Sequence, residues 1–211
     1  MNRTTKSGNM RCVATIRDSG MPAAPSWERF FDPEAILDVL GCTNIRGDAL
    51  EFGCGYGTFT IEVGRRVTGT VYGLDIDRSM VAVTRERASS AGLTNIVAEE
   101  RDFVHLGSGR PDESVSFALL FNILHLEEPI PLLQEVRRVL RPGGRCAVIH
   151  WRRDPATPRG PPPAIRPDSG SCRAWAEKAG LQFVAAPELP RTPWHWGMLM
   201  KRPDPTVRTP T

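Results

Sequence analysis

From position 27 onward, short apolar segments alternate with longer segments whose apolar residues recur every three or four positions. The first pattern is typical of buried strands and the second of amphipathic helices. Strands are predicted over 47–53, 69–76, 95–102, 113–122, 145–151, 181–189 and 195–202, and helices over 30–41, 58–67, 77–92, 128–140 and 168–180. This alternation predicts an α/β fold with a doubly wound, seven-stranded, mostly parallel sheet. No helix separates the last two strands, so we expect a C-terminal hairpin that makes one strand antiparallel.

The predicted helices also show boundary signals. Asp32 is a suitable N-cap for the first helix, Pro33 suits the first helical position, and Gly41 follows the end. The stripe expected along the 77–92 helix consists of Met80, Val83, Arg87 and Ala91.

Length and composition indicate one domain. The 211 residues include 40% hydrophobic and 24% charged side chains, as is ordinary for a globular protein. Residues 1–20 lack apolar periodicity and are expected to be disordered, 21–201 form the domain, and 202–211 form a flexible tail. The proline-rich segment 152–167 suits neither a helix nor a central strand. It is a surface connector, a polyproline ligand for another protein, or a lid, and its departure from the fifth strand favours the lid.

Charge and cysteine content exclude several classes of function. The net charge of +3 comes without a basic stripe, so we expect no nucleic-acid partner. No apolar run reaches the roughly 20 residues that a membrane span needs, and the first residues lack the apolar core of a secretory signal. The five cysteines are scattered and show no zinc-ligand spacing. A reduced, cytoplasmic protein without a metal is expected, as a monomer or homodimer.

The sequence "ALEFGCGYGTFT" at 49–60 places glycines at every second position where a buried strand meets a helix. In a doubly wound sheet, ligands bind beyond the carboxyl ends of the strands, near the first strand–helix turn. Glycines there permit positive φ and let the backbone approach a ligand without an intervening Cβ. The turn therefore predicts a small-molecule site.

The residues around the turn narrow the choice of ligand. Thr58 stands where the third small residue of the dinucleotide fingerprint is expected. Glu51 would repel a pyrophosphate but suits a ligand with a cationic group. Asp75, at the end of the second strand, is placed to bind both hydroxyls of a ribose, or else to cap the helix at 77.

The motifs "LEFGCGYGTFT", "VYGLDID", "RDF" and "VLRPGG" resemble those of the class I S-adenosylmethionine-dependent methyltransferases, which have a Rossmann-like fold. The resemblance extends over nearly all of 27–201 and is nearest to uncharacterised bacterial members. It implies S-adenosylmethionine as the cofactor. The cofactor-binding residues it implies are Glu51 at the methionine amino end, Gly53, Cys54, Gly55 and Gly57 in the close backbone approach, Asp75 at the ribose, Ile76, Asp102 and Phe103 at the adenine, and Asn122 beside the methionine portion.

The candidates for catalysis follow the fourth and fifth strands. Since the sulfonium methyl is already activated, the protein must mainly align the acceptor and exclude water. A general base is needed only for an acceptor that carries a proton until attack. His125, His150 and Arg159 are the candidates for this chemistry, and each is equally suited to a structural role.

No "PPY" follows the fourth strand, no nucleic-acid recognition domain is recognisable, and the cysteines form no thiol cluster. The resemblance implies in-line methyl transfer, and elimination leaves a small-molecule acceptor. The alternatives are a nucleotide-dependent oxidoreductase, which Thr58 disfavours, and a non-catalytic S-adenosylmethionine-binding module.

Overall fold

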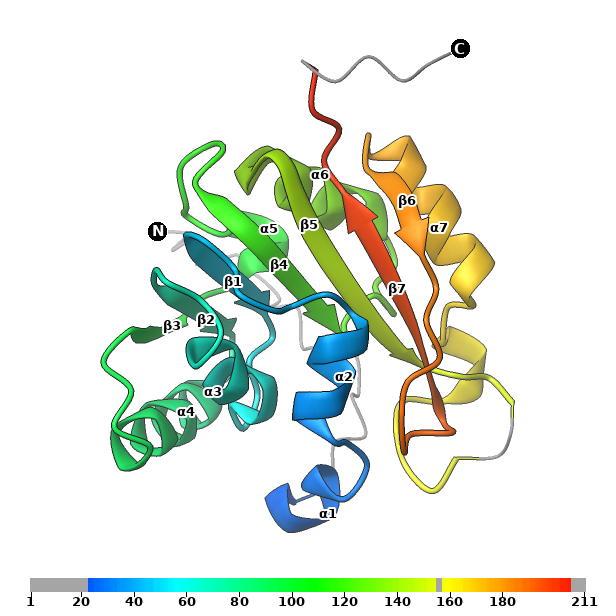
Figure 1. Ribbon diagram of the computed structural model, residues 1–211. Coiled ribbons are helices and arrows are strands. Elements are labelled where there is room, and N and C mark those ends of the chain that lie inside the picture. Colours follow the sequence, from blue (N-terminus) through cyan, green and yellow to red (C-terminus); the bar gives the residue numbers. More distant parts are fainter. Residues whose placement is uncertain (1–22, 155–156, 206–211) are drawn as a thin grey trace, which may run out of the picture.

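The computed structural model describes residues 23–154 and 157–205, so the predictions for 1–20 and for 206–211 of the tail lie outside the described residues. A seven-stranded sheet in the order β3-β2-β1-β4-β5-β7-β6 forms the centre of the molecule (Figure 1). The strands are β1 (Asp48–Phe52), β2 (Val71–Asp75), β3 (Ile96–Glu100), β4 (Val115–Phe121), β5 (Leu140–Trp151), β6 (Gln182–Ala185) and β7 (His195–Lys201). The sheet confirms the predicted α/β, Rossmann-like fold.

The pairing of the strands fixes where a ligand can bind. Strands β1 to β5 pair in parallel, whereas β7 runs antiparallel to both β5 and β6. This arrangement confirms the predicted C-terminal hairpin. Because β1 lies between β2 and β4, the strand order reverses at β1, and the carboxyl ends of β1 and β4 frame the switch point of the sheet.

Helices cover both faces of the sheet, with α2 in front and α6 and α7 behind in Figure 1. The helices are α1 (Ala24–Glu28), α2 (Pro33–Val39), α3 (Thr58–Gly64), α4 (Arg78–Ser90), α5 (Phe103–Leu106), α6 (Pro129–Val139) and α7 (Ser169–Lys178), with a 3₁₀ turn at Pro163–Ile165. One hydrophobic cluster joins α6 and α7 to the sheet, and a second joins α2 and α3 to the other face. Each fully buried Leu, such as Leu37 or Leu133, contributes about 1.5–3 kcal/mol.

The first predicted helix is bounded as its sequence indicates. The Asp32 side chain accepts a hydrogen bond from the Ala35 amide at 3.2 Å, and Gly41 follows the helix with a φ of 71°. Short α1 and α5 were not predicted, since four or five residues are too few to show a helical period.

The stripe predicted for α4 is wrong by one position. The residues that α4 buries are Val81, Thr84 and Ala88. A polar residue occupies this face because the Thr84 hydroxyl donates to the Gly55 carbonyl at 2.9 Å. Arg87 instead donates to the Tyr56 carbonyl at 2.8 Å.

The "RPGG" segment at 141–144 lies within β5 and does not merely precede it. Val115 and Phe117 of β4 pair with Leu140 and Arg145, so five steps along β5 face two steps along β4. The segment therefore bulges out of the sheet. Gly143, with a φ of 73°, supplies the left-handed conformation that the bulge needs.

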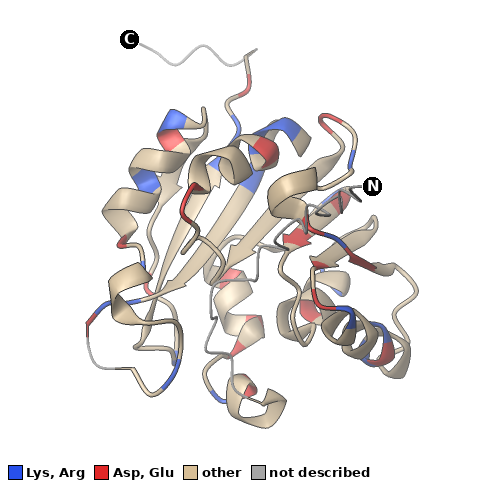
Figure 2. Ribbon diagram, turned by 180° about the vertical axis from the view of Figure 1, so that it is seen from behind, with Lys and Arg blue, Asp and Glu red and all other residues tan. Residues whose placement is uncertain are grey.

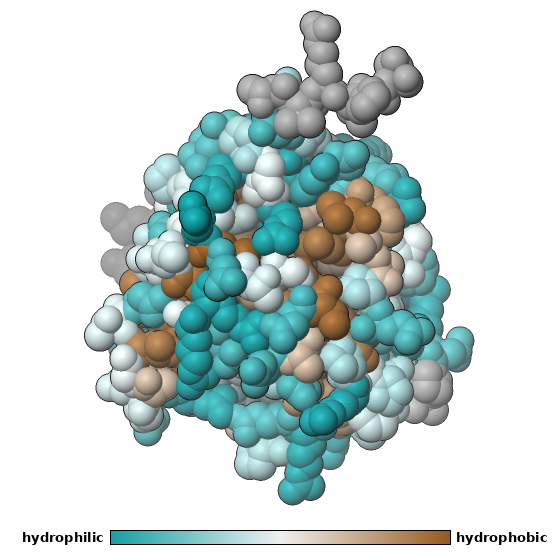
Figure 3. Space-filling view, in the orientation of Figure 1, coloured by the Kyte–Doolittle hydropathy of each residue, from teal (hydrophilic) through white to brown (hydrophobic). Residues whose placement is uncertain are grey.

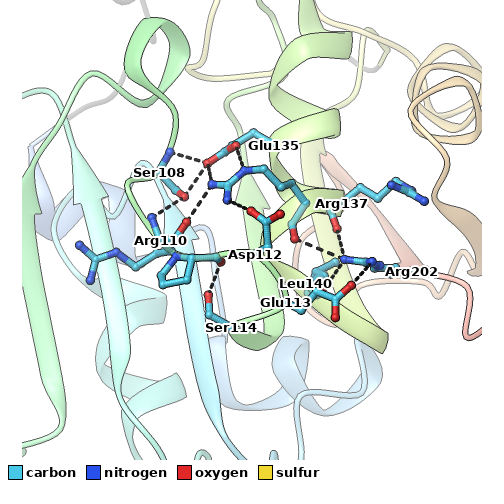
Figure 4. A network of polar contacts seen from close by, with 11 residues as sticks. Ser108, Arg110, Asp112, Glu113, Ser114, Glu135, Arg137, Leu140 and Arg202 are labelled. Atoms are coloured by element: carbon cyan, nitrogen blue, oxygen red, sulfur yellow. Dashed lines mark hydrogen bonds and ion pairs between the residues drawn. The ribbon is translucent and has the colours of Figure 1, made fainter.

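A network of polar contacts holds the opposite edge of the sheet, at the amino ends of the parallel strands (Figure 4). Glu135 of α6 accepts hydrogen bonds from the Ser108 amide at 2.7 Å and from Nε and Nη2 of Arg138, both at 2.7 Å. Burial alone would raise the pKa of Glu135, but the bonds from Arg138 and Ser108 outweigh it and lower the pKa to about 2. Arg202, beyond β7, donates to the Leu140 carbonyl at 2.8 Å. The network ties α6 and the 107–114 loop to the end of β7.

The described part of the proline-rich segment, 152–154 and 157–167, folds around one buried guanidinium. Arg166, only 3% exposed, donates to the carbonyl oxygens of Pro161 at 2.7 Å, Arg152 at 2.8 Å and Arg159 at 3.2 Å. These bonds supply donors to backbone carbonyl oxygens in a segment whose prolines lack the N–H groups that would otherwise pair with them.

The described surface carries charges of both signs. Seen from the α6–α7 side, basic and acidic positions are interspersed on the helices (Figure 2). The face in Figure 3 is largely hydrophilic, with an apolar area over β6 and β7, where Val184 is 44% exposed. Among the described residues, no helix has the length and apolar character that a membrane crossing requires.

Candidate functional site

A cavity of about 1020 Å³ lies at the carboxyl ends of β1, β2 and β4, the edge at which the topology predicts a ligand. It is lined by the glycine turn, the ends of β2 and β4, α5, the segment 121–132 and two tryptophans. Ten of the residues predicted from the sequence line this cavity, namely Glu51, Gly53, Cys54, Gly55, Asp75, Ile76, Asp102, Phe103, Asn122 and His125. The volume is at the upper end of the range for small-molecule sites.

The glycine turn adopts the conformation that its sequence predicts. Gly53, Gly55 and Gly57 have φ values of 80°, 51° and 74°, all in the left-handed region. The amides of Gly53 and Cys54 both donate to the Leu74 carbonyl, at 2.8 and 2.9 Å, which fixes the turn against β2. A Cβ at Gly53 would approach the Ile123 side chain to 2.8 Å. The turn is therefore rigid and presents bare backbone to the cavity.

Gly57 does not line this cavity with the other two glycines. It precedes α3 as the N-cap residue, and a Cβ there would lie 3.0 Å from Oγ1 of Thr84 on α4. Its glycine identity therefore follows from helix packing and positive φ.

Glu51 is almost completely buried, with 2% of its surface exposed, although it lines the cavity. The Thr60 hydroxyl donates to Oε2 of Glu51 at 2.5 Å. Burial raises the pKa of Glu51 to about 8, against the opposing effect of this hydrogen bond, and the charge of Asp75 adds to the rise. A buried carboxyl of this kind has a strong preference for a cationic ligand group, since a nearby positive charge would restore its ionised form.

Asp75 holds the turn and borders the cavity at the same time. Its Oδ2 accepts from the Gly55 amide at 2.8 Å and its Oδ1 from the Asp77 amide at 2.9 Å. Burial raises the pKa of Asp75, while these backbone bonds oppose the rise. The helix cap proposed as an alternative role belongs to Asp77, whose side chain accepts from the Ser79 amide at 2.8 Å.

Asp102 lines the cavity, in the part where the adenine is predicted to bind. It lies two residues beyond the end of β3, whereas the sequence predicted that it would end this strand. It is the N-cap of α5 and accepts from the His105 amide at 3.1 Å, while its Oδ2 lies 2.9 Å from His105 Nδ1. Phe103 packs edge-on against Phe52, with ring centroids 5.4 Å apart. Asp102 thus has the cap role, and its contact with a ligand stays a prediction.

Asn122 shows two unusual features at once. Its φ is 59°, uncommon for a residue other than glycine, and it directly follows β4. Although the residue is only 9% exposed, its Oδ1 and Nδ2 have no hydrogen-bond partner among the described residues. Backbone strain combined with an unsatisfied buried amide is typical of a site where a ligand completes the hydrogen bonding.

The two predicted histidines lie together. His125 lines the cavity and is 4% exposed, whereas His150 on β5 is fully buried and does not line it. His125 Nδ1 lies 3.3 Å from His150 Nε2, and His150 Nδ1 lies 3.3 Å from the Trp151 carbonyl oxygen. The structure therefore brings them into one pair.

Arg159 lies apart from these residues. It is exposed, it does not line the cavity, and its carbonyl accepts from Thr157 Oγ1 at 2.7 Å. None of the described residues of 152–167 lines the cavity. The catalytic role of Arg159 and the lid both stay predictions.

Sequence reasoning missed the aromatic end of the cavity. Trp27, Phe59 and Phe121 line it together with Trp151. They come from α1, α3, β4 and β5, so no local motif joins them. The apolar period of α3 and β4 predicts only that Phe59 and Phe121 are buried.

In the described part of the chain, no three His, Cys, Asp or Glu side chains come together as metal ligands would. The donors around the cavity are carboxylates, amides and imidazoles set beside bare backbone. They fit a cationic adenosyl ligand with a ribose: Glu51 suits an ammonium group, Asp75 a diol and Asn122 a polar group that needs both donor and acceptor. The fold and the cavity together define a cofactor-binding protein of the Rossmann-like class.

Known proteins support a narrower assignment. A family profile described as "Methyltransferase domain" matches residues 49–144. Methyltransferase GfsG of Streptomyces halstedii is 34% identical over 103 residues, 47% of this chain and 36% of that protein. A demethylmenaquinone methyltransferase of Shouchella clausii is 31% identical over 127 residues, 59% of this chain and 51% of that protein. The chain thus spans about a third to a half of the length of these relatives.

Among solved structures, a SAM dependent methyltransferase from Aquifex aeolicus is similar over 84% of this chain and 93% of its own, with a TM-score of 0.74 and 26% identity. Residues 49–144 match a methyltransferase domain, and the chain is similar in fold to the class I S-adenosylmethionine-dependent methyltransferases. This confirms the resemblance seen in the sequence motifs.

Proposed function

We propose that the chain binds S-adenosylmethionine in the 1020 Å³ cavity and transfers its methyl group to a small-molecule acceptor. The single observation that carries the proposal is the rigid glycine turn between two buried carboxyls, Glu51 and Asp75, on the wall of that cavity. S-Adenosylmethionine supplies an electrophilic methyl carbon on a cationic sulfur.

In this proposal the role of the chain is to bind the cofactor and the acceptor and to orient them. Glu51 holds the ammonium of the methionine portion, Asp75 the ribose hydroxyls, and Ile76, Asp102 and Phe103 border the adenine. Asn122 lies between the cofactor and the acceptor, where its unsatisfied amide contacts the methionine portion. Since the reaction needs in-line geometry and the exclusion of water, these contacts and the apolar walls supply most of what the protein must contribute.

A small-molecule acceptor is supported by the shape of the site and by a relative. The cavity is lined by α5 and by the 121–132 segment beside the glycine turn, and its volume suits a small acceptor next to the cofactor. The relative from Shouchella clausii is named for a demethylmenaquinone substrate. We infer an acceptor of that general size.

The test is calorimetric titration with S-adenosylmethionine and, separately, with NAD⁺, followed by incubation with labelled S-adenosylmethionine and fractionated cell metabolites. We expect binding of S-adenosylmethionine, no binding of NAD⁺ and transfer of label to a small molecule. Binding of NAD⁺ alone would indicate the oxidoreductase alternative. Tight cofactor binding without transfer to any fraction would indicate a non-catalytic binding module.

A further inference from the structure

The order of the strands indicates where the acceptor lies in the cavity. Under the proposed function, Asp75 on β2 holds the ribose, Glu51 on β1 holds the amino end, and Asn122 directly follows β4. The next strand in the sheet is β5, so the transferred methyl faces the space over the ends of β4 and β5 (Figure 1). Trp151, the last residue of β5, lines the cavity there, and no residue of β6 or β7 does. Trp151 is therefore the boundary of the cavity on the acceptor side.

The indole of Trp151 is held in place by its neighbours. It is only 1% exposed. The Phe30 ring meets it edge-on with 5.4 Å between centroids, and the His195 ring centroid lies 4.0 Å away. Because interiors are closely packed, an indole enclosed in this way has a fixed position.

The proline-rich segment packs against the same indole through Gly160. A Cβ at Gly160 would lie 2.8 Å from Cδ2 and Cε2 of Trp151 and 3.0 Å from Nε1, all atoms of the five-membered ring. None of the described residues of 152–167 lines the cavity, so this contact is on a side of the indole other than the cavity side. Only a residue without a side chain permits so close an approach.

Arg166 prevents the segment from moving away from the indole. Its guanidinium donates to the carbonyl oxygens of Arg159 and Pro161, the two residues that flank Gly160 in the chain, at 3.2 and 2.7 Å. The same guanidinium lies 5.6 Å from the centroid of the Trp151 ring, within the range of a cation–π contact. One buried side chain thus fixes both the backbone around Gly160 and the ring that this backbone contacts.

We propose that Trp151 determines the largest acceptor that the cavity admits, and that Gly160 and Arg166 are positioning residues that hold its indole at the boundary. The proposal rests on the proposed function of the same cavity. It gives the proline-rich segment a role in substrate selection that needs no contact between the segment and the acceptor. A smaller side chain at 151 should lengthen the acceptor space, and a larger one at 160 should shorten it.

The test uses cofactor analogues whose length can be varied, so no acceptor has to be known. In these analogues of S-adenosylmethionine a nitrogen replaces the sulfur and carries an unbranched alkyl chain of one to about eight carbons. The chain takes the direction of the methyl group, so affinity measured by calorimetry reports how far the cavity extends. For the parent we expect a limiting length, beyond which affinity falls at least about 10-fold because the chain overlaps the indole.

Two substitutions should move this limit in opposite directions. In Trp151→Leu the limit should increase by about two carbons, the difference in side-chain size. In Gly160→Ala the anchored segment cannot retreat, so the new Cβ displaces the indole into the cavity and the limit should decrease by at least about one carbon. In the double variant the Cβ meets no indole, so the limit should equal that of Trp151→Leu.

Gly180→Ala is the matched control. Gly180 has a φ of 85°, and a Cβ there would lie 2.7 Å from Nε of Arg137, away from the cavity. It should lose stability, as Gly160→Ala does, and keep the parental limit. All variants should bind S-adenosylhomocysteine within about 3-fold of the parent. An unchanged limit in Trp151→Leu and Gly160→Ala, with this affinity kept, would overturn the proposal and leave the proposed function intact. Failure of the parent itself to bind S-adenosylhomocysteine would overturn both.

Discussion

Glu51→Gln is expected to unfold at a higher temperature than the parent chain and to bind S-adenosylmethionine about 10- to 100-fold more weakly. The glutamine oxygen still accepts the Thr60 hydrogen bond, and glutamine does not have to take up a proton on folding as Glu51 does. At neutral pH we expect a gain of about 1–3 kcal/mol in the free energy of unfolding, or roughly 2–4 °C in Tm for each kcal/mol. Opposite effects on stability and binding are typical of a group kept for function.

The pH dependence of this gain follows from the pKa of Glu51. Burial raises that pKa from 4.5 to about 8, so between these values the folded state holds a proton that the unfolded state has lost. The free energy of unfolding of the parent therefore falls as pH rises through this window, and the advantage of Glu51→Gln grows over the same range and vanishes below about pH 4.5. Thermal melts from about pH 4 to pH 8.5 measure both curves.

Cofactor binding provides a second readout of the same group. A ligand ammonium beside Glu51 should drive off its proton, so titrations at about pH 7 in buffers of different ionisation enthalpy should show release of nearly one proton by the parent and none by Glu51→Gln. Glu62→Gln on α3, which pairs with Arg65 and Arg66 and does not line the cavity, is the control and should bind normally. Normal affinity in Glu51→Gln would rule out Glu51 as the partner of the ammonium.

Asp75→Ala should lose both stability and binding, because Asp75 has two tasks. Removal of its carboxylate leaves the Gly55 and Asp77 amides without their acceptors in a site that is 6% exposed at this residue. An unsatisfied buried donor costs about 1–3 kcal/mol, so we expect a loss of about 2–4 kcal/mol in the free energy of unfolding. Affinity for S-adenosylmethionine should fall at least 10-fold through the loss of the ribose contact and the loosening of the turn.

Asp168→Ala provides the matched control for Asp75→Ala. Asp168 also accepts a backbone hydrogen bond, from the Ser171 amide at 2.8 Å, but it caps α7 and does not line the cavity. The control should lose about 0.5–2 kcal/mol of stability and keep its cofactor affinity. Denaturant unfolding of both variants measures the stability lost with the backbone hydrogen bonds. Calorimetry of both variants measures the affinity lost with the ribose contact. Unchanged affinity in Asp75→Ala would mean that the ribose lies elsewhere.

The order of elements could be predicted because it depends on local period and local caps. The alternation of apolar and amphipathic segments, Asp32 before α2 and Asp168 before α7 all act within a few residues of chain. The prediction of the buried face of α4 was wrong because a tertiary contact determines that face. Thr84 is buried because its hydroxyl donates to the Gly55 carbonyl, in a turn far away in the sequence. The "RPGG" bulge similarly depends on how β5 aligns with β4.

The residues of the site also divide into those that the sequence could place and those that only tertiary packing places. The glycine turn and Asp75 follow strands directly, so topology alone brings them to one edge. Spacing could not distinguish Gly53, which faces the cavity, from Gly57, which faces α4. Spacing also could not distinguish His125, which lines the cavity, from His150, which does not. Trp27 reaches the site only through the packing of α1.

A crystal structure of the chain with S-adenosylhomocysteine is the most direct measurement of where the cofactor lies. We predict the ribose hydroxyls within hydrogen-bond distance of Asp75, the amino end toward Glu51, and backbone of Gly53 and Gly55 in van der Waals contact with the ligand. The sulfur should lie between Asn122 and the aromatic end. A ligand bound outside the glycine turn, or bound there with its adenine toward Glu51, would contradict the account.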